Sequence, residues 1–584
     1  MEGNKTIATS VQASDDWKFS ELEYKRVDYK QFKKQLLGIL KRFKAAKTYE
    51  EARAVYMEQE QLTKAPFTMN VIAHIRNTLD KTDKFYDEET QYNQKSLAML
   101  MPAEKKLYSA LLKTPFRGDF EREFGRQMFV NAELAEKTSS IKIIFDMIEE
   151  SKLKNEYTKV AAKCKCTFMG EECNFYKLLA YMENPDREIR RQAMIEWAKL
   201  YEGVAPALDE IYDKLIKIRV RMAKKLKLKG GYTELAYMNK GRVDYKPADV
   251  AKFREQVLKV IVPAVDRMKK EQARRIGVDK LKYYDENFVF PDGNANPVGG
   301  EDVLVPIATR MYHELSGETG EFFDFMVKHG LLDLETHAGK HLGGYCTQLA
   351  DYKAPFIFSN FNGTMADVGV LTHEAGHAFQ GYVAARCQTL SANMHSTSEI
   401  NEIHSMTMEH FTYPWLKDFV GEADAEKAQF AHVVDALGSV PYIVAVDEFQ
   451  HRVYEKPSMD AKERRAVWSE IEKKYMPWRD YDGIEFLENG GFWMQKQHIF
   501  LYPFYYIDYS LAQICAFELY GRMKEDKDRA WEDYLRLCRA AGSKGYFELL
   551  EVANLSNPFR EGSVEKAVRH VIDEIERNSE KFRA

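Results

Sequence analysis

Apolar residues recur at spacings of three and four positions over long parts of the chain, set among strong helix formers. The pattern is clearest over residues 29–65, 121–154 and 187–226. Such spacing places the apolar side chains on one face of a helix, so it predicts amphipathic helices. Glycine and proline are used less than average, which favours long helices with few breaks. We therefore predict a mostly α-helical fold.

Strand patterns are few. One is a short hairpin near residues 160–175, and the other is "YCTQLADYKAPFIFSNFNG" at 345–363. Asn184-Pro185-Asp186 indicates a turn followed by a helix start. We place a boundary there, between an N-terminal helical region with the hairpin (1–185) and a larger second region (186–584).

Composition narrows the class of protein. The 584 residues carry a net charge of −5, with basic residues scattered along the chain, which argues against a nucleic-acid surface. No apolar run is long enough for a signal peptide or a membrane span. Seven cysteines without a secretory signal favour reduced thiols. We expect a cytoplasmic protein that binds neither nucleic acid nor membrane.

Three of the cysteines lie close together. Cys164, Cys166 and Cys173 stand in "CKCTFMGEECN". A structural zinc site needs four ligands, and no fourth is nearby. We interpret the segment as the hairpin, with Cys164 and Cys166 on one face.

The stretch "LTHEAGHAFQG" at 371–381 carries the first candidate chemistry. His373 and His377 are four residues apart, one helical turn, and can reach one metal ion from the same face. Glu374 can take a proton from an attacking water, the known mechanism of this pattern. Thr364 or Asp367 can cap the helix. The alternative is a pair of buried histidines on a core helix.

A third ligand is needed. Gln380 and Val383 exclude the long motif with a third histidine, so we look for a carboxylate on a second helix. "STSEINEIHSMTMEHFTYPW" opens with Ser396-x-x-Glu399, a capping-box pattern. Glu402 is the ligand candidate, and Glu409, two turns later on the same face, can hydrogen-bond a ligating histidine. Taken alone, this pair also fits an ordinary solvated helix face.

"HEAGH" followed by Glu402 in "EIHSMTME" resembles the thimet oligopeptidase and oligoendopeptidase F metallopeptidases. The segment "GKHLGGYCTQLADYKAPFIFSNFNGTMADVGVLTHEAGHAF" is similar to the oligoendopeptidase F branch, as are "FYDEE", "RVDYKPADVAKFREQV" and "ELLEVANLSNPF". The resemblance implies a zincin-type, neurolysin-like fold with a small β-sheet beside the zinc helix and a deep substrate channel. It also implies one Zn²⁺ per chain. Two positions depart from many relatives: Gln380 stands in place of histidine, and His404 in place of a small residue.

A tyrosine-rich segment, "QKQHIFLYPFYYIDYSLAQ", supplies further candidates. Pro503 suits the first turn of a helix, with Tyr502 at its mouth and Tyr509 on the same face. Without further context these tyrosines fit a packed core. The resemblance implies that His498, Tyr502 and Tyr509 hold the substrate carbonyl. This segment differs from that of the relatives by one residue in length, so Tyr505 and Tyr506 remain alternatives to Tyr502 and Tyr509.

An endopeptidase also has to hold the backbone of its substrate. The strand patterns at 343–347 and 355–363 offer an edge to which an extended peptide can add, and Gly343, Gly344 and Tyr345 are the candidate contacts. We predict a zinc-dependent endopeptidase of short unfolded oligopeptides, with Glu374 as general base. The alternatives are a carboxydipeptidase of the same family and a non-catalytic peptide-binding scaffold, which would not need Glu374. The sequence predicts no oligomeric state.

Overall fold

The computed structural model describes residues 16–341 and 343–582. Contacts within the chain sort it into two units of interleaved segments. Unit 1 holds the described residues up to Ile141, Asn296–Glu422 and Asp526–Leu555, and unit 2 holds Lys142–Ala295, Ala423–Glu525 and the described residues from Ser556 onward. The division predicted after residue 185 is a single cut in the chain, and it stays a prediction.

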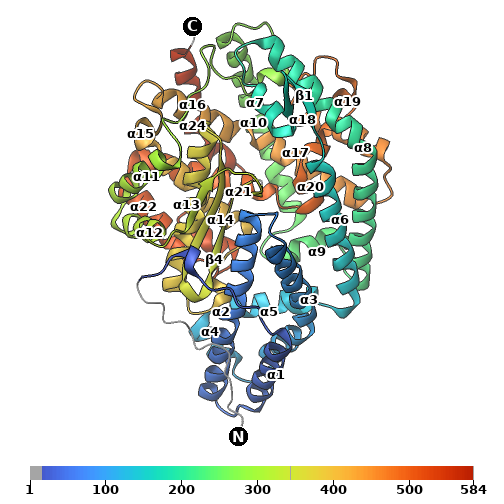
Figure 1. The fold of residues 1–584 in the computed structure, drawn as a ribbon, viewed down its shortest axis with the longest axis vertical. Coiled ribbons are helices and arrows are strands. Elements are labelled where there is room, and N and C mark those ends of the chain that lie inside the picture. Colours follow the sequence, from blue (N-terminus) through green and yellow to red (C-terminus); the bar gives the residue numbers. More distant parts are fainter. Residues whose placement is uncertain (1–15, 342, 583–584) are drawn as a thin grey trace. The chain divides into compact units, whose positions relative to one another are not determined.

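Three long helices open unit 1 and pack side by side: α1 (Tyr29–Ala45), α2 (Tyr49–Leu79) and α3 (Lys84–Leu112) (Figure 1). The predicted periodicity is confirmed in α1, where the buried residues include Phe32, Leu36, Ile39 and Phe43. Asp28 begins this helix, because its carboxylate accepts hydrogen bonds from the first free backbone N–H groups. Two shorter helices follow, α4 (Arg117–Phe124) and α5 (Gln127–Thr138).

A three-stranded sheet lies in the middle segment of unit 1. Its order is β3 (Leu332–Glu335), β5 (Ala354–Phe361), β4 (Tyr345–Leu349), with β5 parallel to β3 and antiparallel to β4. The strands predicted within 345–363 are confirmed, whereas β3 had not been predicted. Because β5 is paired on both sides, the expectation that 355–363 offers a free edge is wrong. Of β4 and β5, only β4 lies at an edge of the sheet.

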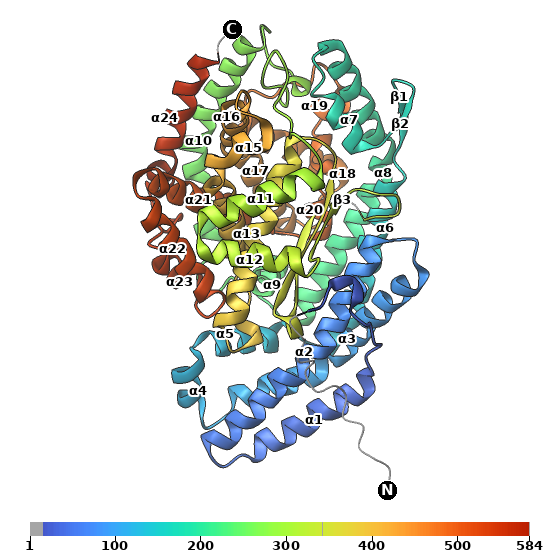
Figure 2. The same cartoon turned by 60° about the vertical axis from the view of Figure 1, so that its left-hand side comes forward.

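The helix that follows β5 is the centre of unit 1. This helix, α13 (Met365–Cys387), packs on β5, α14 (Ser398–Phe411) and α22 (Lys527–Ala540), and Figure 2 shows α12 (Gly317–Lys328) beside it. The fold is thus mostly helical with a small sheet beside α13, as predicted. The other helices of unit 1 are α11 (Glu301–Leu315), α12 (Gly317–Lys328), α15 (Leu416–Val420) and α23 (Tyr546–Val552).

Unit 2 is built almost wholly of helices. The predicted hairpin is present as β1 (Cys166–Phe168) and β2 (Glu171–Cys173), which turn through Met169 and Gly170 at positive φ. The helix start predicted at Asn184-Pro185-Asp186 is confirmed by α8, whose N-cap Asp186 accepts from the Glu188 N–H. The helices are α6 (Ile144–Ala162), α7 (Phe175–Tyr181), α8 (Arg187–Lys225), α9 (Gly231–Asn239), α10 (Pro247–Arg275), α16 (Ala425–Gly438), α17 (Val440–Glu455), α18 (Ala461–Tyr475), α19 (Glu485–Glu488), α20 (Gln497–Leu501), α21 (Ile507–Glu525) and α24 (Ser563–Lys581).

The cysteines and the apolar helices bear on the environment of the protein. All seven cysteines are free thiols, including Cys166 and Cys173, which face each other across the hairpin. Among the described residues, one helical stretch, Ala425–Glu455, is long and apolar enough to cross a membrane. Half of its most apolar window is buried inside the protein, as in a core helix, so it is weak evidence for a span.

Candidate metal centre

Helix α13 brings His373 and His377 onto one face. Their rings lie 5.0 Å apart between centroids and are nearly perpendicular. Thr364 occupies the N-cap position, but its side chain makes no capping bond. Asp367, in the first turn, accepts instead from the backbone N–H groups of Asn362 and Gly363, which precede the helix, and so fixes the chain that enters it. Neither predicted cap therefore makes a side-chain capping bond to the first turn of α13.

Helix α14 carries Glu402 to these histidines. Its Oε2 lies 3.4 Å from Nε2 of His373 and 3.4 Å from Nε2 of His377. Ligands at about 2.0–2.1 Å from a tetrahedral ion stand about 3.3 Å apart, so the spacing fits such an ion. In the part of the chain that the structure describes, these three residues form a possible metal-binding group whose ligand atoms all lie within 4.8 Å of one another. Two imidazoles and one carboxylate leave a fourth position open, as in catalytic zinc sites.

The start of α14 differs from the prediction. Thr397 is the N-cap residue, and the helix begins at Ser398. The predicted capping box of Ser396 and Glu399 is wrong, because Asn401 takes that place. Its side-chain oxygen accepts from the Ser396 N–H, and its amide donates to the Ser396 carbonyl.

Charge within the cluster favours a bound cation. Burial lowers the pKa of His373, but the carboxylates of Glu402 and Glu409 outweigh burial and hold that pKa well above its usual value. Burial likewise raises the pKa of Glu402, while His377 and His373 hold it well below its usual value. Glu402 is only 3% exposed, so little water screens these charges. The arrangement therefore stabilises positive charge between the three side chains.

Glu409 lies behind the first histidine. Its Oε1 is 2.6 Å from Nδ1 of His373, on the side of the ring away from Glu402. A carboxylate at this nitrogen fixes the imidazole as Nδ1–H and leaves Nε2 free to bind a metal. Ser405, between the two glutamates on the same face, donates to the Glu402 carboxylate at 3.0 Å.

Glu374 is buried without a full set of partners. It is 8% exposed, and its Oε2 makes no hydrogen bond to the described residues. Burial raises the pKa of this carboxyl, and the two histidines beside it oppose the rise. An unpaired buried carboxylate oxygen is costly. A water or substrate atom therefore fits beside it.

The backbone of α14 comes very close to α13 at Gly376. A Cβ added there would lie 2.7 Å from the His404 carbonyl oxygen and 2.7 Å from the Ser405 Cα. Only glycine allows this approach, which sets the distance between Glu402 and the histidines. Sequence reasoning missed this positioning residue, although a small residue inside the His-Glu-x-x-His pattern was a usable signal.

We expect Gly376→Ala to destabilise the protein and to weaken metal binding. The new methyl meets backbone rather than a flexible side chain, so the helices must move apart, at a cost of about 1–3 kcal/mol. Chemical denaturation and metal content measure the two effects. Gly369→Ala is the control on the same helix, since a Cβ there meets nothing within 4 Å and should be neutral or slightly stabilising. Equal stability of Gly376→Ala and Gly369→Ala would contradict the close approach of α13 and α14 at Gly376.

The two unusual positions are both buried. Gln380 donates from Nε2 to the Met394 carbonyl at 3.0 Å, which ties α13 to the segment before α14. His404 lies edge-on to the ring of Tyr534 on α22, and burial lowers its pKa to about 3. Tyr534 in turn donates to the His404 carbonyl. Both positions act in packing rather than as ligands in this geometry.

The candidate substrate-binding residues lie before and at the start of β4. Gly343 and Gly344 are exposed, and a Cβ on Gly344 would be 3.7 Å from Oε1 of Glu374. The Tyr345 ring stacks on Phe358 at 4.8 Å, and its hydroxyl bonds that of Thr78 at 2.6 Å. Gly344 is thus adjacent to Glu374, whereas the Tyr345 side chain is engaged within the fold.

His498 is surrounded by four tyrosines in unit 2. Their ring centroids lie 4.9–6.2 Å from that of His498. The residues are Tyr502, Tyr505, Tyr506 and Tyr509. Tyr502 is 57% exposed, the most of any large side chain in this cluster.

The predicted helix through this segment is wrong. Pro503 does not open a helix: α20 ends at Leu501, and α21 begins at Ile507. Phe504 has φ +60° and breaks the helical path, while Gln450 accepts a hydrogen bond from its backbone N–H. Tyr502 and Tyr509 therefore do not share one helical face. The turn, rather than helical spacing, gathers them around His498.

Comparison with known proteins places these features in a wider group. The Peptidase M3 N-terminal domain matches residues 19–139, and Peptidase family M3 matches 180–297 and 311–566. An oligoendopeptidase F homolog of Borreliella burgdorferi is 21% identical over 64% of this chain and 63% of its own length, so the match spans under two thirds of that relative. The structure of PZ peptidase A with an inhibitor matches with TM-score 0.92 and 46% identity over 96% of this chain and 99% of that one. An oligoendopeptidase F structure from Bacillus anthracis matches with TM-score 0.87 and 43% identity over 97% and 99% of the two chains.

Proposed function

This chain belongs to peptidase family M3, and we propose that it is a zinc-dependent endopeptidase that cleaves internal bonds of short, unfolded oligopeptides. One observation carries the proposal: His373, His377 and Glu402 converge beside the buried carboxylate of Glu374. The donor set of two imidazoles and one carboxylate fits Zn²⁺ with an open fourth position. When bound, zinc would act as a Lewis acid toward water and the substrate carbonyl.

The residues of the chain have separate roles in this proposal. Glu374 accepts the proton of the attacking water and delivers it to the leaving nitrogen as the C–N bond breaks and the new C–O bond forms. Glu409 holds the Nδ1 proton of His373, so that Nε2 stays directed toward the metal. Burial of Glu402 and Glu374 keeps the field at the site strong.

The sheet suggests how the peptide backbone is held. β4 has a strand partner on one side, β5, so we propose that an extended peptide adds along β4. Gly343 and Gly344 let that backbone approach closely, and Gly344 lies next to Glu374. Tyr345 supports the strand through Phe358 and Thr78.

Cleavage of peptides that are blocked at both ends tests the proposed function. A library of peptides with acetylated N-termini and amidated C-termini should be cut internally by the zinc-loaded protein, and a chelator should stop the reaction. A carboxydipeptidase would need a free C-terminus and release dipeptides only, whereas a binding scaffold would cut nothing. Either result would replace the proposed activity. We further propose that the protein acts in the cytoplasm, with oligopeptides rather than nucleic acids or membranes as partners.

We also propose that His498, Tyr502 and Tyr509 donate hydrogen bonds to the substrate carbonyl as negative charge develops on it. Tyr502→Phe and Tyr509→Phe keep the ring and remove the donor, and each should lower kcat by about 100-fold while changing KM little. Steady-state kinetics on one blocked peptide separate the two constants. Tyr505→Phe and Tyr506→Phe are matched controls in the same ring cluster. Wild-type kcat in both test variants, with a loss in a control, would transfer the role to that control.

A further inference from the structure

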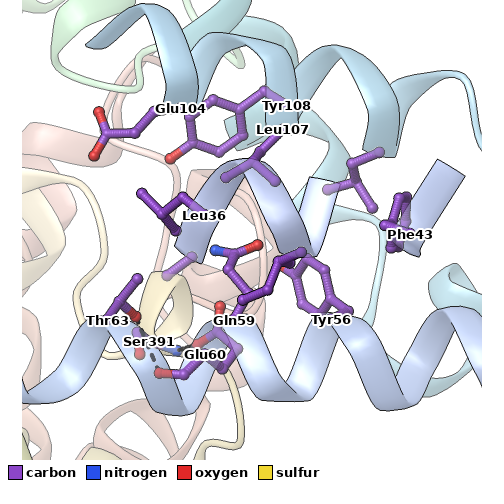
Figure 3. A pocket seen from close by; sticks show the side chains of 13 residues that line it. Leu36, Phe43, Tyr56, Gln59, Glu60, Thr63, Glu104, Leu107, Tyr108 and Ser391 are labelled. Carbon is purple, nitrogen blue, oxygen red and sulfur yellow. Dashed lines mark hydrogen bonds between the residues drawn. The ribbon is translucent and has the colours of Figure 1, made fainter. Parts of the chain in front are cut away.

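A cavity lies among the N-terminal helices of unit 1, apart from the residues of the metal centre. Helices α1, α2 and α3 and the short 3₁₀ helix η5 (Ser391–Asn393) line this partly open cavity of about 230 Å³ (Figure 3). Leu36, Phe43 and Leu107 are among its apolar walls. An apolar cavity of about 150 Å³ accepts a benzene-sized molecule. This cavity therefore has room for one aromatic ring with a short chain.

The charged side chains of the cavity are all acidic, and the neutral polar residues Gln59, Thr63 and Ser391 also line it. Glu60 and Tyr56 come from α2, Glu104 and Tyr108 from α3, and none of the 13 lining residues is a lysine, arginine or histidine. Figure 3 shows Glu104 and Tyr108 on the opposite side of the cavity from Glu60. The cavity thus combines two carboxylates and two electron-rich rings with apolar walls and no cationic side chain.

The two carboxylates differ in what they contact. Glu60 is 6% exposed, and its Oε2 accepts from the Ser391 N–H at 2.7 Å, so it serves to hold η5 in place. Glu104 forms no hydrogen bond or ion pair with any residue the structure describes. Burial raises its pKa, and the nearby Glu104 and Glu60 carboxylates add to the effect of burial on Tyr108. Glu104 is therefore a partly desolvated acid without a protein partner.

Charge complementarity selects the kind of ligand. A carboxylate in an apolar setting gains most from a charge-assisted hydrogen bond to an ammonium group. The faces of Tyr56 and Tyr108 also attract cations, and the apolar walls favour a hydrocarbon body. An anion would be repelled, and a neutral molecule would leave the carboxylate without a counter-charge.

We propose that this cavity binds a small primary ammonium ion with a compact aromatic or branched aliphatic body, its nitrogen against Glu104. The ammonium donates to the Glu104 carboxylate beside Tyr108, and the apolar body lies against Leu36 and Leu107. This binding does not depend on peptide hydrolysis.

Three probes of equal ring and similar chain length test the charge preference by calorimetric titration of the whole protein. 2-Phenylethylamine should bind at one saturable site. 2-Phenylethanol should bind at least about tenfold more weakly than 2-phenylethylamine. 3-Phenylpropionate should show no binding at this site. Equal affinity of the amine and the alcohol, or no saturable binding of the amine, would overturn the proposal.

A pair of variants locates the site. Glu104→Gln changes one charge at nearly constant shape and should weaken amine binding by about tenfold or more. Glu88→Gln on the same helix is the control, because Glu88 is exposed and does not line the cavity. The affinity of this variant for the amine should equal that of the wild type. A thermal melt verifies that both variants are folded. Unchanged amine affinity in folded Glu104→Gln would place the ligand elsewhere and refute the assignment.

Discussion

Glu374→Gln is expected to retain zinc and to lose nearly all peptide hydrolysis. Glutamine has almost the same shape but cannot accept the proton of the attacking water, and general-base assistance is worth about 10²–10⁴-fold. The proposed metal ligands His373, His377 and Glu402 remain in place, so metal content after dialysis should stay at one equivalent. Turnover of a blocked peptide and metal analysis on the same sample are the two measurements.

The stability of this variant is a further check. Glu374 is buried with one carboxylate oxygen unpartnered, and burial raises its pKa. Removing that charge should leave the protein as stable as the wild type or more stable. Glu374→Asp keeps the charge but withdraws it by one methylene. Its peptide hydrolysis should therefore be slower than that of the wild type and faster than that of Glu374→Gln. Near-native turnover of Glu374→Gln would refute the role of general base.

Glu402→Ala is expected to lose both metal and activity. The substitution leaves two imidazoles and solvent, where three candidate ligands now converge. The substitution also removes the carboxylate that would balance the charge of a cation bound between the two imidazoles. Zinc retained after dialysis measures the loss directly. Glu402→Gln, which preserves volume, separates loss of the ligand charge from loss of packing.

Glu409→Gln provides the graded comparison. Glu409 contacts His373 at Nδ1, behind the ligand atom, so its loss should weaken metal affinity by about 10–100-fold without abolishing it.

A full equivalent of tightly held zinc in Glu402→Ala would exclude Glu402 as the third ligand. Glu399 and Glu409 would then be the next candidates.

The parts of the site that follow from local geometry could be predicted from the sequence. One helical turn fixes the relation of His373 to His377, and two turns fix that of Glu402 to Glu409. Both relations are present in α13 and α14. That the two helices meet is expected from the need for a third ligand and from the family resemblance rather than from local geometry, since the approach at Gly376 depends on tertiary packing.

Other features depend on contacts between distant residues. Phe504 takes a positive φ while its N–H bonds to Gln450, 54 residues earlier, so helical spacing could not predict how the tyrosines are grouped. β3 is four residues long and pairs in parallel with β5, a pairing that no local pattern specifies. At the start of α14, the side chain of Asn401 outcompetes the capping box of Ser396.

The interleaving of the two units has a consequence for synthesis on the ribosome. One side of α13 is covered by α22, where Trp531 and Tyr534 lie against Phe379. Between the two helices in the sequence lies Ala423–Glu525, which belongs to the other unit. A nascent chain therefore exposes the apolar side of α13 while about a hundred residues of unit 2 are translated. Chaperones that shield apolar segments would act on the chain during this interval, and a stall before α22 would leave an aggregation-prone intermediate rather than a folded fragment.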